Sequence, residues 1–237
     1  LYPNGNPIRV TMQDTEYFYF CSPFPLVRVP ATVDAIADPD AYEAYTCLVP
    51  GTTLKGDTPR VERDRQGRVV WDWKPNTSPL NATQQQQLLD TGLLQPGELW
   101  IDVRDVETSE PVILRPGTLH WNEFKNKYIL IGEQIYGSSL LGEIWYSEAP
   151  SPMGPWDRAR KIVTHETYSF YNPAHHPFFD QDNGRVIYFE GTYTKTFSGA
   201  KIPTPRYDYN QIMYRLDLAD PRLKAATEQQ AEAGDTP

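Results

Sequence analysis

A strand pattern that occurs twice between residues 115 and 218 constrains the fold of this chain more than any other feature. Each copy contains a polar-aromatic strand, a turn, a β-branched and aromatic strand, a loop and a further strand. The central strands of the two copies are residues 127–133 and 185–190. Each copy is roughly 45–55 residues long, and repeats of that length built from short strands are typical of propeller blades. The sequence therefore predicts an all-β fold, specifically a β-propeller.

The two copies also predict the order of the strands within each sheet. In the first copy we expect an inner strand at 117–122, followed by strands at 128–133, 143–147 and 156–163. In the second copy we expect an inner strand within 168–179, followed by strands at 185–190 and 211–218. β-Prone runs at 7–10, 16–21, 26–29 and 41–49 predict an earlier blade of the same kind.

Residues 50–98 interrupt this pattern, and we expect them to be a small hairpin and helix insertion between blades. A turn at Gly67 predicts the hairpin. Asn81 followed three residues later by Gln84 predicts the N-terminal capping box of a short helix over 82–91. Residues 1–218 would then form one partial propeller domain. The polar residues 219–237 would form a frayed or disordered C-terminal tail.

The expected number of blades is about three, whereas propellers typically have four to eight. A ring of blades must close to protect its strand edges. We therefore expect the chain to be a fragment, the C-terminal portion of a longer protein whose complete propeller has five blades.

The charge balance argues against two classes of partner. The chain has 31 acidic and 22 basic residues, a net charge of −9, and no basic cluster. An acidic surface repels nucleic acid phosphates and anionic membranes. The sequence also has no run of about 18 apolar residues that would span a bilayer. We therefore expect neither nucleic acid nor membrane as a partner.

The two cysteines, Cys21 and Cys47, are too few for a disulfide framework. They either pair across neighbouring strands or remain two buried thiols. Two cysteines alone do not make a zinc site.

Two segments resemble five-bladed β-propeller glycoside hydrolases of the arabinanase/xylosidase-like families and their relatives. Residues 146–156, which end in Gly154-Pro155-Trp156, are similar to an element that closes blades in those enzymes. Residues 171–179 with 184–190 are similar to a strand pair of the DUF4185-type relatives of these enzymes. The resemblance covers about 115–218. It implies a secreted, extracellular or periplasmic protein that binds and hydrolyses a glycosidic bond in a polysaccharide or oligosaccharide.

Glycoside hydrolysis needs two carboxyl groups about 5–5.5 Å apart for retention, or about 6.5–9.5 Å apart for inversion. One of them must hold a proton near neutral pH. Candidates on or beside the predicted strands are Glu123, Glu133, Glu143 and Glu190. We predict Glu190 and Glu133, at equivalent places in the two copies, as the catalytic residues, with Glu190 as the general acid. The alternative is that both are strand-end glutamates with purely structural partners.

Polar and aromatic side chains of the predicted inner strands are expected to line the sugar-binding channel. The predicted substrate-binding residues are His120, Asn122, Tyr171, Asn172, His175 and Tyr193. His175 and His176 are adjacent, so on a strand they face opposite ways and only one can face the channel. No organic cofactor is expected. The resemblance allows a channel-bound cation held by a histidine, without specifying its ligands.

Fold alone does not separate an enzyme from a binding protein. The alternative function is a non-catalytic carbohydrate-binding or surface-interaction propeller, and a third possibility is a structural domain of a larger secreted protein. If the first catalytic carboxylate lies upstream of Leu1, the present chain would be inactive alone. Two channel-facing carboxylates favour the enzyme. Aromatic and amide groups with one acid or none favour the binding protein.

Overall fold

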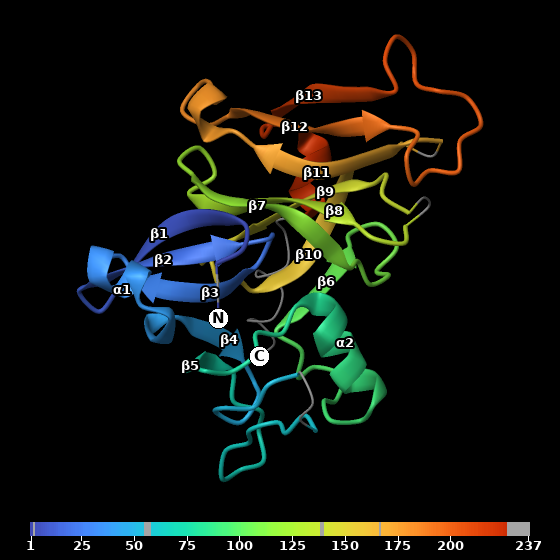
Figure 1. The fold of residues 1–237 in the computed structure, drawn as a ribbon. Helices are drawn as coiled ribbons and strands as arrows, with labels where there is room; N and C mark the ends of the chain where they lie inside the picture. Colours follow the sequence, from blue (N-terminus) through green and yellow to red (C-terminus); the bar gives the residue numbers. More distant parts are fainter. Residues whose placement is uncertain (2, 55–57, 138–139, 166, 227–237) are drawn as a thin grey trace, which may run out of the picture. The chain divides into compact units, whose positions relative to one another are not determined.

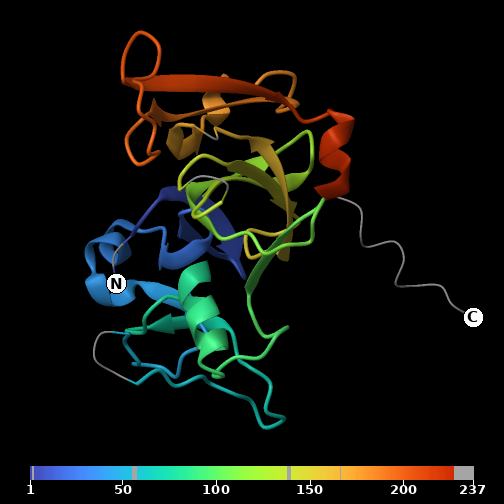
Figure 2. The same cartoon turned by 90° about the vertical axis from the view of Figure 1, so that its right-hand side faces the viewer.

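The computed structural model describes the chain except for residues 2, 55–57, 138–139, 166 and 227–237. The described residues divide into two compact units (Figures 1 and 2). The first contains Leu1–Asp102 and Pro116–Leu119, and the second contains Val103–Arg115 and His120–Pro237.

The first unit is built on one antiparallel sheet with the strand order β1-β2-β3-β4-β5. Its strands are β1 (Asn6–Met12), β2 (Thr15–Cys21), β3 (Pro25–Pro30), β4 (Glu43–Thr46) and β5 (Asp72–Pro75). The predicted early blade is thus confirmed as a sheet. Its helices are α1 (Val33–Ala37), η1 (Pro39–Ala41) and α2 (Ala82–Asp90).

Two further sheets provide the second unit, with a few residues of β6 and β7 assigned to the first. One has the order β6-β10-β9-β8-β7, formed by β6 (Ile101–Asp105), β7 (Leu114–Asn122), β8 (Lys127–Gln134), β9 (Ile144–Ala149) and β10 (Trp156–Val163). The other has the order β11-β12-β13, formed by β11 (Ser169–His175), β12 (Val186–Thr194) and β13 (Tyr209–Asp217). Short helices η2 (Pro177–Phe179) and η3 (Pro221–Ala226) follow β11 and β13.

The all-β class and the strand order within both repeat copies are confirmed. Among the described residues the strands form three separate sheets, and none of these sheets closes on itself. The propeller ring and its number of blades therefore stay predictions.

The region predicted as an insertion is partly integrated into the first sheet. The capping box of α2 forms as expected, with the Asn81 side chain accepting from the Gln84 backbone and the Gln84 side chain accepting from the Asn81 backbone. Residues 72–75, however, pair with β4 as β5. Trp73 explains this difference, because its ring packs against Tyr45 at 5.2 Å and Tyr19 at 4.8 Å between centroids. These ring contacts stabilise the pairing of β5 with β4.

The second unit is held together by apolar side chains between its two sheets. Ile129 and Ile131 of β8, and Ile144 and Tyr146 of β9, point to the same side of their sheet, since side chains alternate along a strand. They belong to one buried cluster with residues of the three-stranded sheet, namely Phe170, Ile187 and Phe189. This face of β8 and β9 therefore packs into the core between the two sheets of the second unit, and we call it the inter-sheet core face.

The predicted tail begins later than expected. Leu223 of η3 is only 3% exposed and belongs to the same core cluster, because η3 folds back beside β10 (Figure 2). The remaining tail residues, 227–237, lie outside the described residues. Within the described part of the chain, no helix is long and apolar enough to cross a membrane.

Cys21 and Cys47 are both buried free thiols, so they do not pair.

Gly154 has φ +100°, which only glycine adopts readily, and Trp156 after it is 2% exposed. The Trp156 indole N–H donates to the Pro152 carbonyl at 3.1 Å. The turn therefore has the structural role expected from its sequence.

The inter-sheet core predicts the effect of adding one methyl group at Gly191. A Cβ at this position would lie 2.6 Å from two ring atoms of Phe170. We expect Gly191→Ala to destabilise the protein by about 1–3 kcal/mol through overpacking, more than the roughly 0.5–1 kcal/mol that alanine gains over glycine in a strand. Urea denaturation followed by tryptophan fluorescence measures the change. In a Phe170→Leu background the cost should shrink, and an equal cost in both backgrounds would contradict the proposed clash.

Candidate functional site

Glu133 is one of three buried glutamates of the second unit, together with Glu143 and Glu148. It follows Ile129 and Ile131 at alternate positions of β8, so its side chain points into the inter-sheet core face. The residue is 0% exposed. One carboxyl oxygen, Oε2, accepts the backbone N–H of Asn172 at 3.0 Å. The other, Oε1, is buried and has no hydrogen-bond partner among the described residues.

This environment changes the acidity of Glu133. Burial raises the pKa of the carboxyl group to about 8, and the hydrogen bond from Asn172 lowers it by a smaller amount. At neutral pH the folded protein therefore holds Glu133 mainly in its protonated, uncharged form.

Asn172 reaches Glu133 because β11 is irregular at this point. The pairing of β11 with β12 shifts between Tyr171 and Ala174, and Asn172 has φ +55°. Asparagine tolerates this left-handed conformation better than most residues. The backbone N–H consequently turns out of the ladder toward Glu133. The sequence predicted Asn172 as a site residue, but the contact is made by its backbone.

His120 and His175 come together further along β11. Their ring centroids are 5.2 Å apart at nearly perpendicular planes, and His175 Nε2 lies 2.9 Å from Asp180 Oδ1. Burial, together with the nearby His175 and His176, lowers the pKa of His120 to about 4. His120 is therefore neutral at physiological pH. Asp180 was not predicted, since its position after η2 places it beside β11 only in the folded chain.

His176 and Glu190 form a second pair on the other side of the three-stranded sheet. His176 Nε2 lies 3.0 Å from Glu190 Oε1, and both side chains are partly exposed. Along β12, Phe189 belongs to the inter-sheet core, so Glu190 points away from that core. His175 and His176 thus face opposite ways, as their adjacency predicts. Glu133 and Glu190 consequently lie on different sides of the sheet β11-β12-β13.

The remaining predicted residues have separate surroundings. The Asn122 amide donates to the Gly184 carbonyl at 2.8 Å and accepts the Lys125 N–H at 2.9 Å, so it joins two turns. Tyr193 packs against His165, with ring centroids 5.1 Å apart. The Tyr171 hydroxyl donates to the Tyr209 hydroxyl at 2.9 Å.

Sequence reasoning did not single out His165, which has several contacts with polar and aromatic groups. Its Nε2 lies 2.8 Å from the Tyr214 hydroxyl, and its ring stacks on Phe170 at 4.9 Å. Burial lowers the pKa of His165, and the nearby Glu143 carboxylate partly opposes this effect. His165 lies in a connection between strands, where neither periodicity nor a motif marks it.

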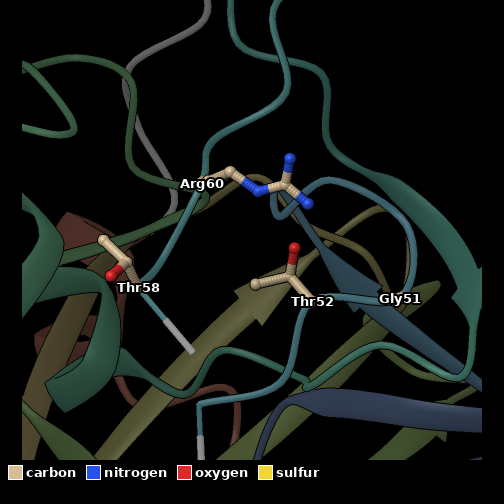
Figure 3. Close-up of a pocket in the computed structure, with 4 residues that line it drawn as sticks. All are labelled: Gly51, Thr52, Thr58 and Arg60. Carbon is tan, nitrogen blue, oxygen red and sulfur yellow. The ribbon is translucent and has the colours of Figure 1, made fainter. Parts of the chain in front are cut away.

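The described residues contain no group of three or more His, Cys, Asp or Glu side chains arranged to hold a metal ion. A polar cavity of about 380 Å³ is present in the first unit, lined by Gly51, Thr52, Thr58 and Arg60 (Figure 3). None of the predicted site residues lines it.

No protein-family model matches the sequence, and no curated protein matches it. Two crystal structures of exo-β-1,3-galactanase variants from Phanerochaete chrysosporium with β-1,3-galactotriose are similar, each with 9% identity and a TM-score of 0.30. The similarity covers 92% of this chain and 39% of the galactanase chain. An exo-1,5-α-L-arabinanase from a bovine ruminal metagenomic library has 10% identity and a TM-score of 0.34, covering 89% of this chain and 73% of that one. These values do not assign the chain to a family.

The raised pKa of Glu133 predicts a pH-dependent stability. The folded-state pKa of about 8 exceeds the ordinary value of 4.5. The protonated Glu133 carboxyl group therefore contributes fully to the free energy of unfolding below about pH 4.5, and this contribution is lost as the pH rises through 8. Glu133→Gln keeps an acceptor for the Asn172 N–H but cannot ionise. We expect the variant to gain stability relative to the native protein between pH 5 and pH 9, on the order of 4 kcal/mol.

Urea denaturation of both proteins at several pH values measures this difference. Taking the variant as the reference cancels the contributions of other titrating groups. A stability difference that stays constant across the pH range would show that Glu133 titrates normally.

Proposed function

We propose that the protein binds a polysaccharide or oligosaccharide and hydrolyses a glycosidic bond, with Glu133 as the proton donor. The observation that carries this proposal is the Glu133 carboxyl group, which is fully buried and oriented by the Asn172 N–H, because burial of this kind raises the pKa of a carboxyl group. A general acid must be protonated at the working pH and close to it in pKa. A value of about 8 meets both conditions.

The surroundings of Glu133 support the same role. The Asn172 N–H fixes the direction of the carboxyl group, as a positioned acid requires. Tyr171, the preceding residue, has a pKa raised to about 12, first by its hydrogen bond with Tyr209 and to a smaller extent by Glu133. The Glu133 carboxyl group contacts the β11 backbone next to Tyr171, whose ring points to the other side of the sheet. Sugar-facing sites commonly combine such rings with a few polar groups.

Two observations favour the alternative, a carbohydrate-binding protein without catalysis. Glu133 is fully buried, so a substrate must displace the side chains that cover Glu133 before the carboxyl group can donate a proton to it. Glu190, which the sequence favoured as the general acid in place of Glu133, points away from the core face into which Glu133 points. Hydrolysis requires two carboxyl groups on the two sides of one glycosidic bond. A binding protein has no such requirement.

Activity measurements on Glu133→Gln and Glu190→Gln separate these functions. The purified protein is incubated with soluble β-1,3-galactan, linear 1,5-α-arabinan and xylan, hereafter the glycan panel, and released reducing ends are quantified. We expect Glu133→Gln to lower turnover at least 100-fold, the usual contribution of a general acid, while near-UV circular dichroism stays unchanged. Loss in Glu190→Gln as well would identify Glu190 as the second carboxyl group.

Glu123→Gln is the matched control, because Glu123 lies at an exposed position after β7. It should leave turnover unchanged. Native turnover in Glu133→Gln would remove Glu133 from the mechanism. Binding of a panel glycan without turnover by the native protein would establish the binding function instead.

A further inference from the structure

Large aromatic rings are exposed at one end of the three-stranded sheet. The segment 195–208 connects β12 and β13 and projects beyond their ends (Figure 1). Phe197 and Tyr207 in this segment are 59% and 72% exposed, and Tyr209 at the start of β13 is 64% exposed. Exposed rings forgo the favourable free energy of burial, and clustered exposed apolar groups commonly mark interaction sites.

Buried hydroxyl groups fix this segment against the sheet. Thr194 is 0% exposed and donates to the Asp208 carbonyl at 2.6 Å. Ser169 is 1% exposed and donates to the Thr196 carbonyl at 2.6 Å. Thr204 is 4% exposed and accepts from the Asn210 amide at 3.1 Å. The protein thus holds the segment in one conformation while its rings stay in solvent, which is the preorganisation that a binding surface needs.

Three rings form a connected surface with polar edges. The rings of Tyr171 and Phe197 have centroids 6.0 Å apart at an angle of 72°, and those of Tyr171 and Tyr209 are 6.5 Å apart. The hydroxyl groups of the two tyrosines are hydrogen-bonded at 2.9 Å. On the same side of the sheet, Gln211 accepts from the Thr192 hydroxyl at 2.8 Å. Aromatic faces therefore alternate with hydroxyl and amide groups.

We propose that Tyr171, Phe197 and Tyr209 form a stacking platform for a sugar ring of a polysaccharide chain. The C–H groups on one side of a sugar ring fit the electron-rich face of an aromatic ring. Its hydroxyl groups fit the tyrosine hydroxyls and the Gln211 amide. The ligand class rests on the proposed function, but the platform does not require that hydrolysis takes place. Tyr171 also links the platform to the acid, because the next residue, Asn172, contacts Glu133.

Calorimetric titration with the glycan panel tests the platform. Binding is measured in a Glu133→Gln background, which prevents turnover during the titration. We expect Phe197→Ala and Tyr209→Ala each to weaken binding about tenfold, the equivalent of about 1.4 kcal/mol for a lost ring contact. Tyr209→Phe keeps the ring and should change the affinity less than threefold. Phe124→Ala removes a ring that is 43% exposed on the turn between β7 and β8, and it should have no effect.

The outcomes separate the platform from the proposed catalysis. Ring-dependent binding without turnover by the native protein supports the platform and refutes the role of Glu133. Turnover that depends on Glu133, combined with unchanged binding in both alanine variants, overturns the platform alone. Failure of the native protein to bind any panel glycan also overturns it. A remaining outcome is that Phe197→Ala and Tyr209→Ala alter self-association instead of sugar binding. Light scattering detects a change in self-association, and this result would also overturn the proposal.

Discussion

The apolar contact between the β8-β9 pair and the three-stranded sheet is the interaction on which the second unit depends. It buries Ile131, Tyr146 and Phe189 in one continuous cluster. Burial of a large apolar side chain stabilises a fold by about 1.5–3 kcal/mol, so this cluster is a major stabilising contribution. The same face of β8 carries Glu133. The core that stabilises the unit therefore also supplies the low-polarity surroundings that keep this acid uncharged.

The irregularity of β11 connects this core with the outer side of the sheet. Before it, Tyr171 points outward to Tyr209. At it, the Asn172 N–H leaves the ladder and contacts Glu133. After it, His175 points inward to His120, and His176 points outward to Glu190. A regular strand would pair the Asn172 N–H or direct it elsewhere, so one backbone conformation determines the environment of the buried acid.

Opposite sides of one sheet thus have different chemistry. The inner side contains a protonated acid and a neutral imidazole in an environment of low polarity. The outer side contains partly exposed pairs of polar groups and exposed rings. Groups in water bind and exchange sugars readily, whereas a proton donor is more effective when water is excluded. An enzyme would have to bring both environments to one substrate at the edge of β11.

Local patterns in the sequence determined the elements of this protein. Runs of β-branched and aromatic residues predicted β8, β9 and β12, and Asn81 with Gln84 predicted the start of α2, because these features depend on neighbours along the chain. Equivalence of the two repeat copies also suggested that Glu133 and Glu190 have equivalent roles. That inference did not foresee that they point to different sides of the sheet.

Only the tertiary structure decided which strand face is buried against a second sheet and where a backbone N–H leaves its ladder. Both depend on packing between segments distant in the sequence. The acidity of Glu133 and the neutral state of His120 follow from that packing, because burial dominates both pKa shifts. Trp73 joined the first sheet for the same reason, since its aromatic partners lie about 30 and 50 residues away along the chain.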